Sequence, residues 1–265
     1  MAVVNTNVNA SVAQNALVRN ERSMNSAMER LSTGQRINSA SDDAAGLAIA
    51  SRMTSQIRGL ETGIRNANDA ISMINTADGA LIEVTNMLQR MRELALQASN
   101  GTTTSADRDY LNSEYVNLLA EIERIAQNTQ WNGRDILDGT ANGTSGTVAF
   151  QVGANGGQTV SVNFGNATNA AVASTSGLIQ DVNSAAATIT AGTTASALTK
   201  GTSAVTAIDT AITNVNSQRA TFGAAMNQLT YAVDNLSNVK VNSEAARSRI
   251  LDTDYAQETS ELART

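Results

Sequence analysis

Residues 56–99 read QIRGLETGIRNANDAISMINTADGALIEVTNMLQRMRELALQAS and carry the strongest periodic pattern of the chain. Apolar side chains recur every three or four residues, which places them on one face of an α-helix. The pattern is that of a coiled-coil seam with one irregularity, two successive three-residue steps between residues 71 and 77. We therefore predict a long helix whose seam packs against another helix. The main seam residues are Ile57, Leu60, Ile64, Ile71, Ile74, Leu81 and Leu88.

A second seam with the same spacing runs from residue 202 to residue 238. The spacing holds if Arg219 occupies one seam position, where its long side chain would reach solvent or pair with a carboxylate. Because a turn-rich stretch separates the two seams, we expect them to pack antiparallel. The second set of seam residues is Ile208, Ile212, Phe222, Leu229 and Leu236.

Two shorter elements are predicted between the seams. The pair Asn100-Gly101 is a signal for the end of a helix, and Thr104 to Asp107 form a capping-box pattern that predicts a new helix over 105–129. Residues 147–165 alternate apolar and polar side chains around a Gly/Asn-rich turn, which predicts a β-hairpin. The predicted fold is mainly α, a long antiparallel coiled-coil or helical bundle from both chain ends with a small β-hairpin.

The composition excludes several classes of function. The 265 residues include no Pro, Cys or His, and the net charge is −6. Disulfides, zinc sites built on His or Cys, and catalysis by a His-based triad are therefore excluded. The acidic balance disfavours nucleic-acid binding, and no stretch approaches the roughly 18 apolar residues of a membrane span. We expect a protein that is not an enzyme, with no catalytic residue, metal or cofactor.

The two extremities and the middle differ from the seams. Residues 8–32 and 242–264 are weakly amphipathic and would be marginal as isolated helices, so we expect them to become ordered on meeting a partner. Between residues 140 and 199 the only charged residue is Asp181. This Ser/Thr-rich middle is compatible with O-linked sugars and equally with a plain loop.

Several blocks of the sequence resemble bacterial flagellins. They are LSTGQRINSASDDAAG at 31–46, NDAISMINTADGAL at 68–81, LQRMRELA at 88–95 and AARSRILDTDYA at 245–256. The hairpin segment FQVGAN at 150–155 is similar to the family's hairpin. The resemblance covers roughly residues 1–165 and 200–265, with the blocks in the family's order.

The resemblance implies an architecture and a cellular role. Residues 1–45 would form an inner-tube helix and a connecting spoke, and 46–165 the N-terminal part of the helical core with the hairpin. Residues 166–200 would be a short variable surface loop, 201–240 the C-terminal core helix, and 241–265 the C-terminal inner-tube helix. We expect this last helix to be shortened, because flagellins continue past the position of Thr265.

The partners and location follow from the same resemblance. The chain would polymerise with its own copies into the extracellular filament of the bacterial flagellum, which serves motility. It would be exported unfolded through the flagellar type III apparatus, with an export chaperone and a filament cap as further partners. The first residues lack the basic and apolar regions of a cleaved secretion signal, which agrees with that route.

One helix face is a candidate contact surface. Arg90, Glu93, Leu94, Gln97 and Glu114 fall outside or on the border of the seams. By composition alone they form a solvated face. The resemblance implies that they contribute to protofilament contacts and to recognition of the monomer by Toll-like receptor 5, with an exposed Leu flanked by Arg as the anchor.

Acidic pairs have a structural interpretation. Asp42 and Asp43 are adjacent, so their side chains point apart, and charge at a helix N-terminus explains them better than a metal site. Asp252 and Asp254 are interpreted as packing or inter-subunit hydrogen-bonding residues.

Two other functions stay open. A hook–filament junction protein shares the terminal architecture, and a secreted helical-bundle binding module would be a stable monomer.

Overall fold

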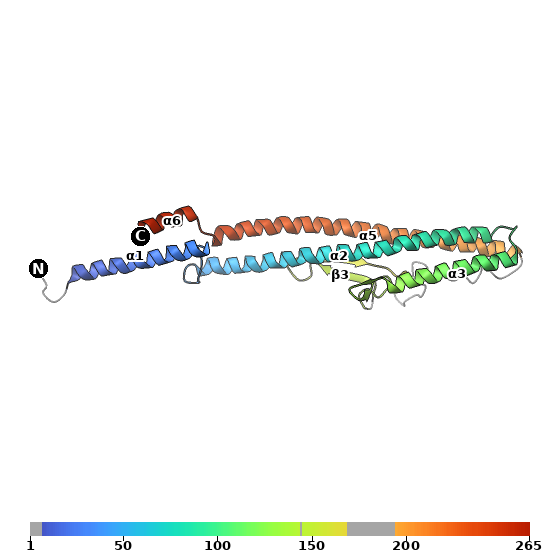
Figure 1. The fold of residues 1–265 in the computed structure, drawn as a ribbon, viewed down its shortest axis with the longest axis horizontal. Helices are drawn as coiled ribbons and strands as arrows, with labels where there is room; N and C mark the ends of the chain where they lie inside the picture. Colours follow the sequence, from blue (N-terminus) through green and yellow to red (C-terminus); the bar gives the residue numbers. More distant parts are fainter. Residues whose placement is uncertain (1–6, 144, 169–193) are drawn as a thin grey trace. The chain divides into compact units, whose positions relative to one another are not determined.

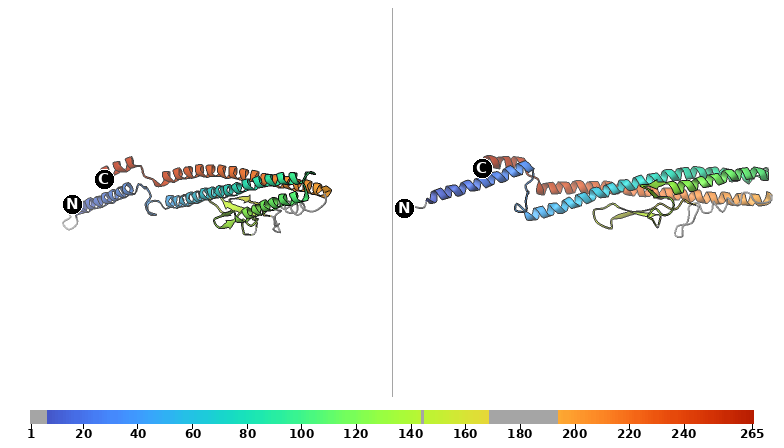
Figure 2. Two further views of the ribbon diagram at one scale, coloured as in Figure 1. Left: turned by 45° about the vertical axis from the view of Figure 1, so that its right-hand side comes forward. Right: turned by 60° about the horizontal axis from the view of Figure 1, so that its bottom comes forward.

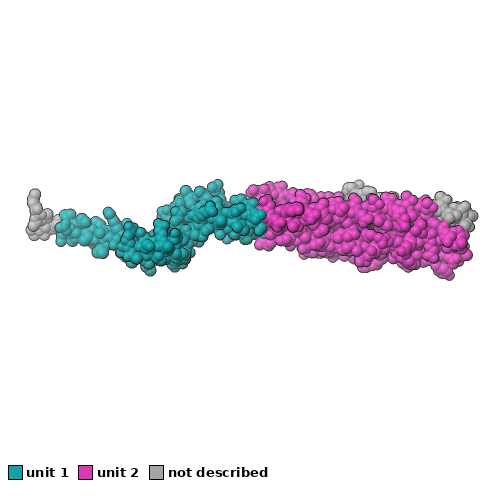
Figure 3. Space-filling model, turned by 90° about the horizontal axis from the view of Figure 1, so that it is seen from above, with its two compact units in different colours: residues 1–61, 236–265 teal, residues 62–235 magenta. Residues whose placement is uncertain are grey.

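The computed structural model describes residues 7–143, 145–168 and 194–265, with side chains from residue 201 onward in the last stretch. It divides into two compact units, one of residues 1–61 with 236–265 and the other of residues 62–235 (Figure 3). The long helices α2 (Ala44–Ala98) and α5 (Thr194–Leu251) contribute residues to both units (Figure 1). The variable loop expected within 166–200 lies mostly outside the described residues.

The first unit contains α1 (Val8–Thr33) and α6 (Tyr255–Arg264), which contact each other. Helix α1 ends at Gly34, whose left-handed φ of 69° lets its N–H donate to the Arg30 carbonyl. That conformation costs a residue with a Cβ more than it costs glycine. Helix α6 begins at Asp254, whose carboxylate accepts hydrogen bonds from the N–H groups of the first turn.

The boundary near the C-terminus differs from the expected one. The sequence places a helix change at residue 241, whereas α5 runs on to Leu251 and the break falls at residues 252–254. The segment that follows α1, residues 34–36, explains this break. The Arg36 N–H donates to the Leu251 carbonyl at 2.6 Å, and the Thr253 N–H donates to the Gly34 carbonyl at 3.1 Å. These bonds replace the helical partners of α5 and end it there.

The second unit is built on α2, α5 and α3 (Ser105–Asn128), which lie side by side in the views of Figures 1 and 2. Helices α2 and α5 pack antiparallel. Arg219 of α5 pairs with Asp78 of α2 at 2.8 Å, and further along Arg92 of α2 pairs with Asp209 of α5 at 2.6 Å. The antiparallel helical fold is therefore confirmed, and Arg219 does pair with a carboxylate from its half-buried seam position.

Two small hairpins lie in the second unit. Strands β1 (Gln130–Trp131) and β2 (Arg134–Asp135) are joined by a two-residue turn, Asn132-Gly133, with φ values of 50° and 75°. The pair Asn-Gly suits such a turn because both positions need a positive φ. Strands β3 (Thr147–Gln151) and β4 (Thr159–Asn163) pair antiparallel, which confirms the predicted hairpin.

The hairpin β3–β4 is attached to both long helices. Asn66 of α2 donates its amide N–H to the Gln151 carbonyl at 2.9 Å, and Gln218 of α5 donates to the Asn163 carbonyl at 2.6 Å. Just after β4, the buried Phe164 ring lies 5.4 Å from the ring of Phe222 on α5. A hairpin of this size is marginal alone, so these contacts hold it.

The predicted seam residues differ in their burial. Ile74, Leu81, Leu88, Ile208, Phe222 and Leu229 are completely buried in the second unit, and Ile57 and Leu60 are buried in the first. Ile64, Ile71, Ile212 and Leu236 are half-buried. Within the described residues, none of the helices has a stretch apolar and long enough to span a bilayer.

Candidate functional site

The predicted contact surface lies across α2 and α3, and we call it the α2–α3 face: Arg90, Glu93, Gln97 and Glu114. The Arg90 guanidinium donates to Glu93 on its own helix and to Glu114 on α3, with both N–O distances 2.9 Å. All four side chains are exposed. The two carboxylates raise the pKa of Arg90, Glu114 being the stronger influence through its hydrogen bond. The structure therefore joins Arg90, Glu93 and Glu114 by ion pairs, and Gln97 lies exposed one helical turn beyond Glu93 on α2.

Local helix chemistry fixes where α3 meets α2. Thr104 caps α3, since its hydroxyl accepts from the Asp107 N–H while the Asp107 carboxylate accepts from the Thr104 N–H. The hydrogen bonds from Thr104 hold the pKa of Asp107 below its ordinary value. Arg108, in the same turn, is buried and donates from Nε to the Ala98 carbonyl at 3.2 Å. The end of α2 is thus bonded to the start of α3, and this contact fixes which residues of α2 lie beside Glu114.

Leu94 does not belong to this surface. The sequence interpretation made it an exposed anchor, but its side chain is 1% exposed. Helix α2 is flanked by α3 on one side and α5 on the other, as the Arg90–Glu114 and Arg92–Asp209 pairs show. A helix packed on two sides buries a wider stripe than a two-helix seam, and Leu94 falls inside it.

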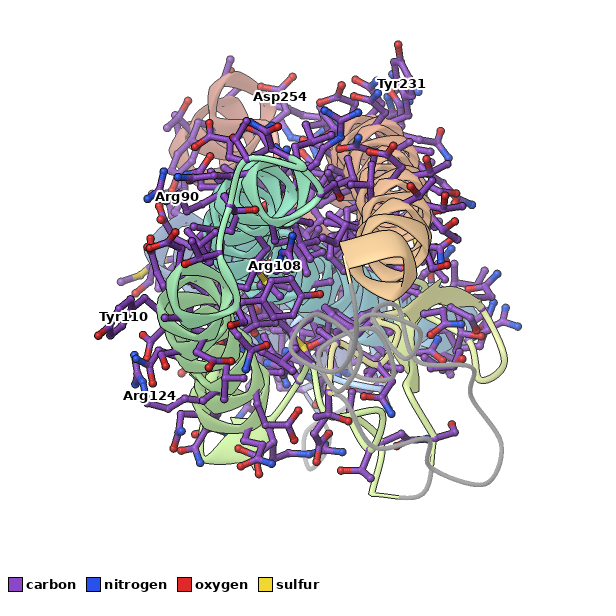
Figure 4. The ribbon with its side chains drawn as sticks, turned by 90° about the vertical axis from the view of Figure 1, so that its right-hand side faces the viewer. Arg90, Arg108, Tyr110, Arg124, Tyr231 and Asp254 are labelled. Carbon is purple, nitrogen blue, oxygen red and sulfur yellow. The ribbon has the colours of Figure 1, made fainter. Side chains whose placement is uncertain are left out.

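Tyr110 is a member of the surface that the sequence analysis missed. Its side chain is 76% exposed, and it stands one helical turn before Glu114 on α3. Figure 4 shows Arg90, Tyr110 and Arg124 on the side of α2 and α3 that faces away from α5, with Tyr231 on the α5 side. The sequence contains one signal for it: Tyr110 precedes Glu114 by four residues, a spacing that places both side chains on one face of α3.

A second surface lies on α1 in the first unit, and we call it the α1 apolar face: Leu17, Met24 and Met28. These side chains are 69%, 39% and 54% exposed. Their spacing of seven and four residues places them on one side of the helix. They face solvent in the isolated chain.

Helix α6 contacts the other side of α1. Arg30 pairs with Glu258 of α6 at 3.0 Å, and Glu258 is buried. A groove between the helices is lined on α1 by Arg22, Ser23, Ser26, Ala27 and Arg30. At 3.6 residues per turn the centre of this stripe lies roughly 150° around the helix from the α1 apolar face, so the two lie on nearly opposite sides of α1. Helix α6 therefore leaves the α1 apolar face uncovered.

The acidic pair at the start of α2 serves the backbone. Asp43 Oδ1 accepts from the Gly46 N–H at 2.9 Å, at the N-terminus of the helix. Asp42 instead accepts from the Asn38 and Ser39 N–H groups, and these bonds lower its pKa, that of Ser39 most. In the part of the chain that the structure describes, no three acidic side chains gather as they would around a metal ion.

Comparison with known proteins places both ends of the chain. Residues 4–142 match the bacterial flagellin N-terminal helical region, and residues 205–265 match the bacterial flagellin C-terminal helical region. The flagellin of Halalkalibacterium halodurans is 43% identical over 263 residues, which cover 99% of this chain and 90% of that protein.

More distant relatives agree. Flagellin A of Vibrio cholerae is 34% identical, over an alignment covering 98% of this chain and 92% of that protein. Among solved structures, a putative flagellar hook-associated protein from Vibrio parahaemolyticus aligns with a TM-score of 0.64, covering 80% of this chain and 100% of that one. At 16% identity this last likeness concerns the fold alone.

Proposed function

The chain belongs to the bacterial flagellin family, as a structural, non-enzymatic subunit of the extracellular flagellar filament, and from this premise we propose how its two units serve assembly. The first unit supplies the innermost contacts of the filament, through α1 and α6. The second unit forms the shell around them, through α2, α3, α5 and the hairpin. In this division residues 31–46 form the spoke between the layers.

The observation that carries this proposal is the α1 apolar face. Leu17, Met24 and Met28 are exposed on the side of α1 that α6 does not contact. Large apolar side chains gathered on one helix face mark an interaction site. In a protein that associates with its own copies, neighbouring subunits are the partners that would cover this face.

Seeded growth tests the proposal. Purified chain is added to short filament fragments, and electron microscopy follows their lengthening. We expect Met28→Glu to stop growth, because a buried carboxylate without a partner is costly, whereas Met28→Leu should grow like the parent. Growth of Met28→Glu at the parent rate would refute the role of the α1 apolar face. A parent chain that stays monomeric would instead favour a secreted binding module.

For the second unit we propose recognition of the monomer by Toll-like receptor 5 through the α2–α3 face. Arg and Tyr are enriched among residues that dominate binding energy, and Arg90 with Tyr110 supplies both types on one exposed surface. The same face would contact neighbouring subunits, so the filament would hide it from the receptor.

Matched arginine variants test the receptor proposal. Arg90→Ala should lower receptor activation in reporter cells by at least roughly tenfold. Arg92→Ala is the control, because Arg92 is a similarly exposed arginine that pairs with Asp209 on the α5 side of α2 and lies outside the α2–α3 face. Equal activation by both variants would refute the assignment. Leu94→Ala is unsuitable, because it would also open a cavity in the core.

The remaining partners follow from family membership. We propose that the chain leaves the cell unfolded through the flagellar type III apparatus, with an export chaperone and a filament cap acting before and during assembly. The absence of Cys suits such a route, because no disulfide has to form or break.

A further inference from the structure

The chain carries four Asn-Gly pairs, at residues 100, 132, 142 and 155, all among the described residues. In such a pair the glycine main-chain nitrogen can attack the asparagine side-chain carbonyl carbon, since glycine has no Cβ to hinder it. A bond forms from that nitrogen to Cγ, the Cγ–Nδ2 bond breaks, and Nδ2 leaves as ammonia with the proton lost by the glycine nitrogen. Water then opens the cyclic imide to aspartate or isoaspartate.

We propose that Asn100 is a self-modifying site, the Asn-Gly pair at which the folded chain deamidates fastest. The attacking group is unrestrained here, because the Gly101 N–H donates no hydrogen bond to any residue that the structure describes. Both residues are exposed to water, which is the second reactant. The amide that must react is therefore free, hydrated and next to a glycine.

The turn also prepares the asparagine side chain. The Thr102 N–H points at Asn100 Oδ1 from 3.4 Å, and the Thr103 N–H donates to the Asn100 carbonyl at 3.2 Å. Attack at Cγ builds negative charge on Oδ1, so a donor already aimed at that oxygen stabilises the transition state as the contact shortens. In the other three pairs, no described residue donates a hydrogen bond to the asparagine Oδ1.

The fold restrains the other three pairs. Asn132 has a left-handed φ of 50° inside the β1–β2 turn, which both strands fix. At Asn142 the attacking Gly143 N–H is already bonded to the Thr140 carbonyl. These two sites should be the slowest.

The Asn155 backbone is bonded on both sides, at its N–H by Gln158 Oε1 at 3.1 Å and at its carbonyl by Gln151 Nε2 at 2.6 Å. The Asn100 backbone is bonded in the same way, by Gln97 at its N–H and by Thr103 at its carbonyl, so the two sites differ in the donor to Oδ1, which Asn155 lacks among the described residues. The Gly156 nitrogen is not bonded to a described residue. Asn155 should therefore rank between Asn100 and the two slow sites.

The product alters the end of α2. A carboxylate at residue 100 adds negative charge two residues beyond Ala98, where the helix dipole disfavours it. Asn100→Asp, which mimics the product, should therefore unfold about 1–3 °C lower than the parent. Asn155→Asp in the hairpin loop is the matched control and should leave the melting temperature unchanged.

Peptide mapping by mass spectrometry tests the proposal on the full chain incubated at neutral pH. The rate of ammonia loss should fall in the order Asn100, Asn155, then Asn132 and Asn142, with Asn142 slower than Asn100 by roughly fivefold or more, since one hydrogen bond must break first. In denaturant the four rates should converge. Conversion of Asn132 or Asn142 as fast as Asn100 in the folded chain would overturn the proposal.

Gly101→Ala supplies the matched variant. A Cβ at residue 101 meets no atom within 4 Å, so the variant should fold like the parent. It should slow conversion at Asn100 and leave Asn155 unchanged. An unchanged Asn100 rate in this variant would mean that Gly101 nitrogen is not the attacking group, and the proposal would fail.

Discussion

The contact between the Phe164 and Phe222 rings should measurably join the hairpin to α5. Both side chains are completely buried, with ring centroids 5.4 Å apart and planes tilted by 52°. Replacing either ring by Leu should lower the free energy of unfolding of the second unit by about 1–2 kcal/mol. A tilted aromatic pair adds roughly 0.5–1.5 kcal/mol beyond the buried area. The double variant should therefore lose less than the sum of the two single losses, by that amount.

Urea unfolding followed by Trp131 fluorescence measures these energies. Trp131 is the only Trp of the chain and packs against the core of the second unit, so it reports on that unit. Ile208→Val is the control partner for Phe164→Leu, because residue 208 lies 14 positions from Phe222, about 21 Å along the helix. This second cycle should be additive within roughly 0.5 kcal/mol. A coupling of zero between the two Phe variants would refute this ring–ring contact.

Three further changes have expected outcomes. Gly79→Ala should stabilise the second unit by about 0.5–1 kcal/mol in thermal unfolding, because no atom lies within 4 Å of the new Cβ. Gly63→Ala should destabilise the unit, because the new Cβ would lie 2.6 Å from the carbonyl oxygen of Val152 in the hairpin. Thr104→Ala should cost about 1 kcal/mol in urea unfolding. It should also weaken the acid sensitivity of α3. The pKa of Asp107 is lowered from 3.8 in the folded chain, chiefly by its hydrogen bonds with Thr104. The stabilisation that the Asp107 carboxylate gives is therefore complete above pH 3.8 and is lost as the pH falls through the lower pKa of the folded state. Arg219→Met should cost about 1–2 kcal/mol by the same assay, because it leaves a half-buried carboxylate of α2 unpaired.

The three–four spacing of apolar residues predicted most of the fold. The seams predicted α2, α5 and their antiparallel packing because one-sided burial imposes a three–four spacing on the sequence. Even the irregular position, Arg219, was predicted to pair with a carboxylate or reach solvent, and it pairs with Asp78. The capping box at Thr104 and the hairpin over 147–165 are local signals, and both were found where they were expected.

Features set by tertiary contacts were not predictable in the same way. Leu94 looked exposed because a single seam at Met91 and Ala95 does not show that α3 packs on the flank of α2. The break after Leu251 depends on hydrogen bonds from residues 34–36, far away in the sequence. The local signal there was Asp254 followed three positions later by Gln257, a helix-start pattern that was overlooked.

The sequence indicated which residues belong to the α2–α3 face, but not how their side chains are arranged. Arg90 and Glu93 are three positions apart on one helix, so their pairing follows from helical spacing. The bond from Arg90 to Glu114 depends on how the loop after residue 98 aligns α3 with α2. That alignment is set by the buried Arg108 and the Thr104 cap, which sequence spacing does not reveal.

The central claim is that copies of this chain cover the α1 apolar face in the filament. Brief oxidation by peroxide, read by peptide mapping, tests it on monomer and filament prepared from the same protein. Met24 and Met28 should convert to the sulfoxide in the monomer and be protected in the filament, whereas the buried Met73 and Met91 should resist in both. Equal oxidation of Met24 and Met28 in monomer and filament would contradict the claim.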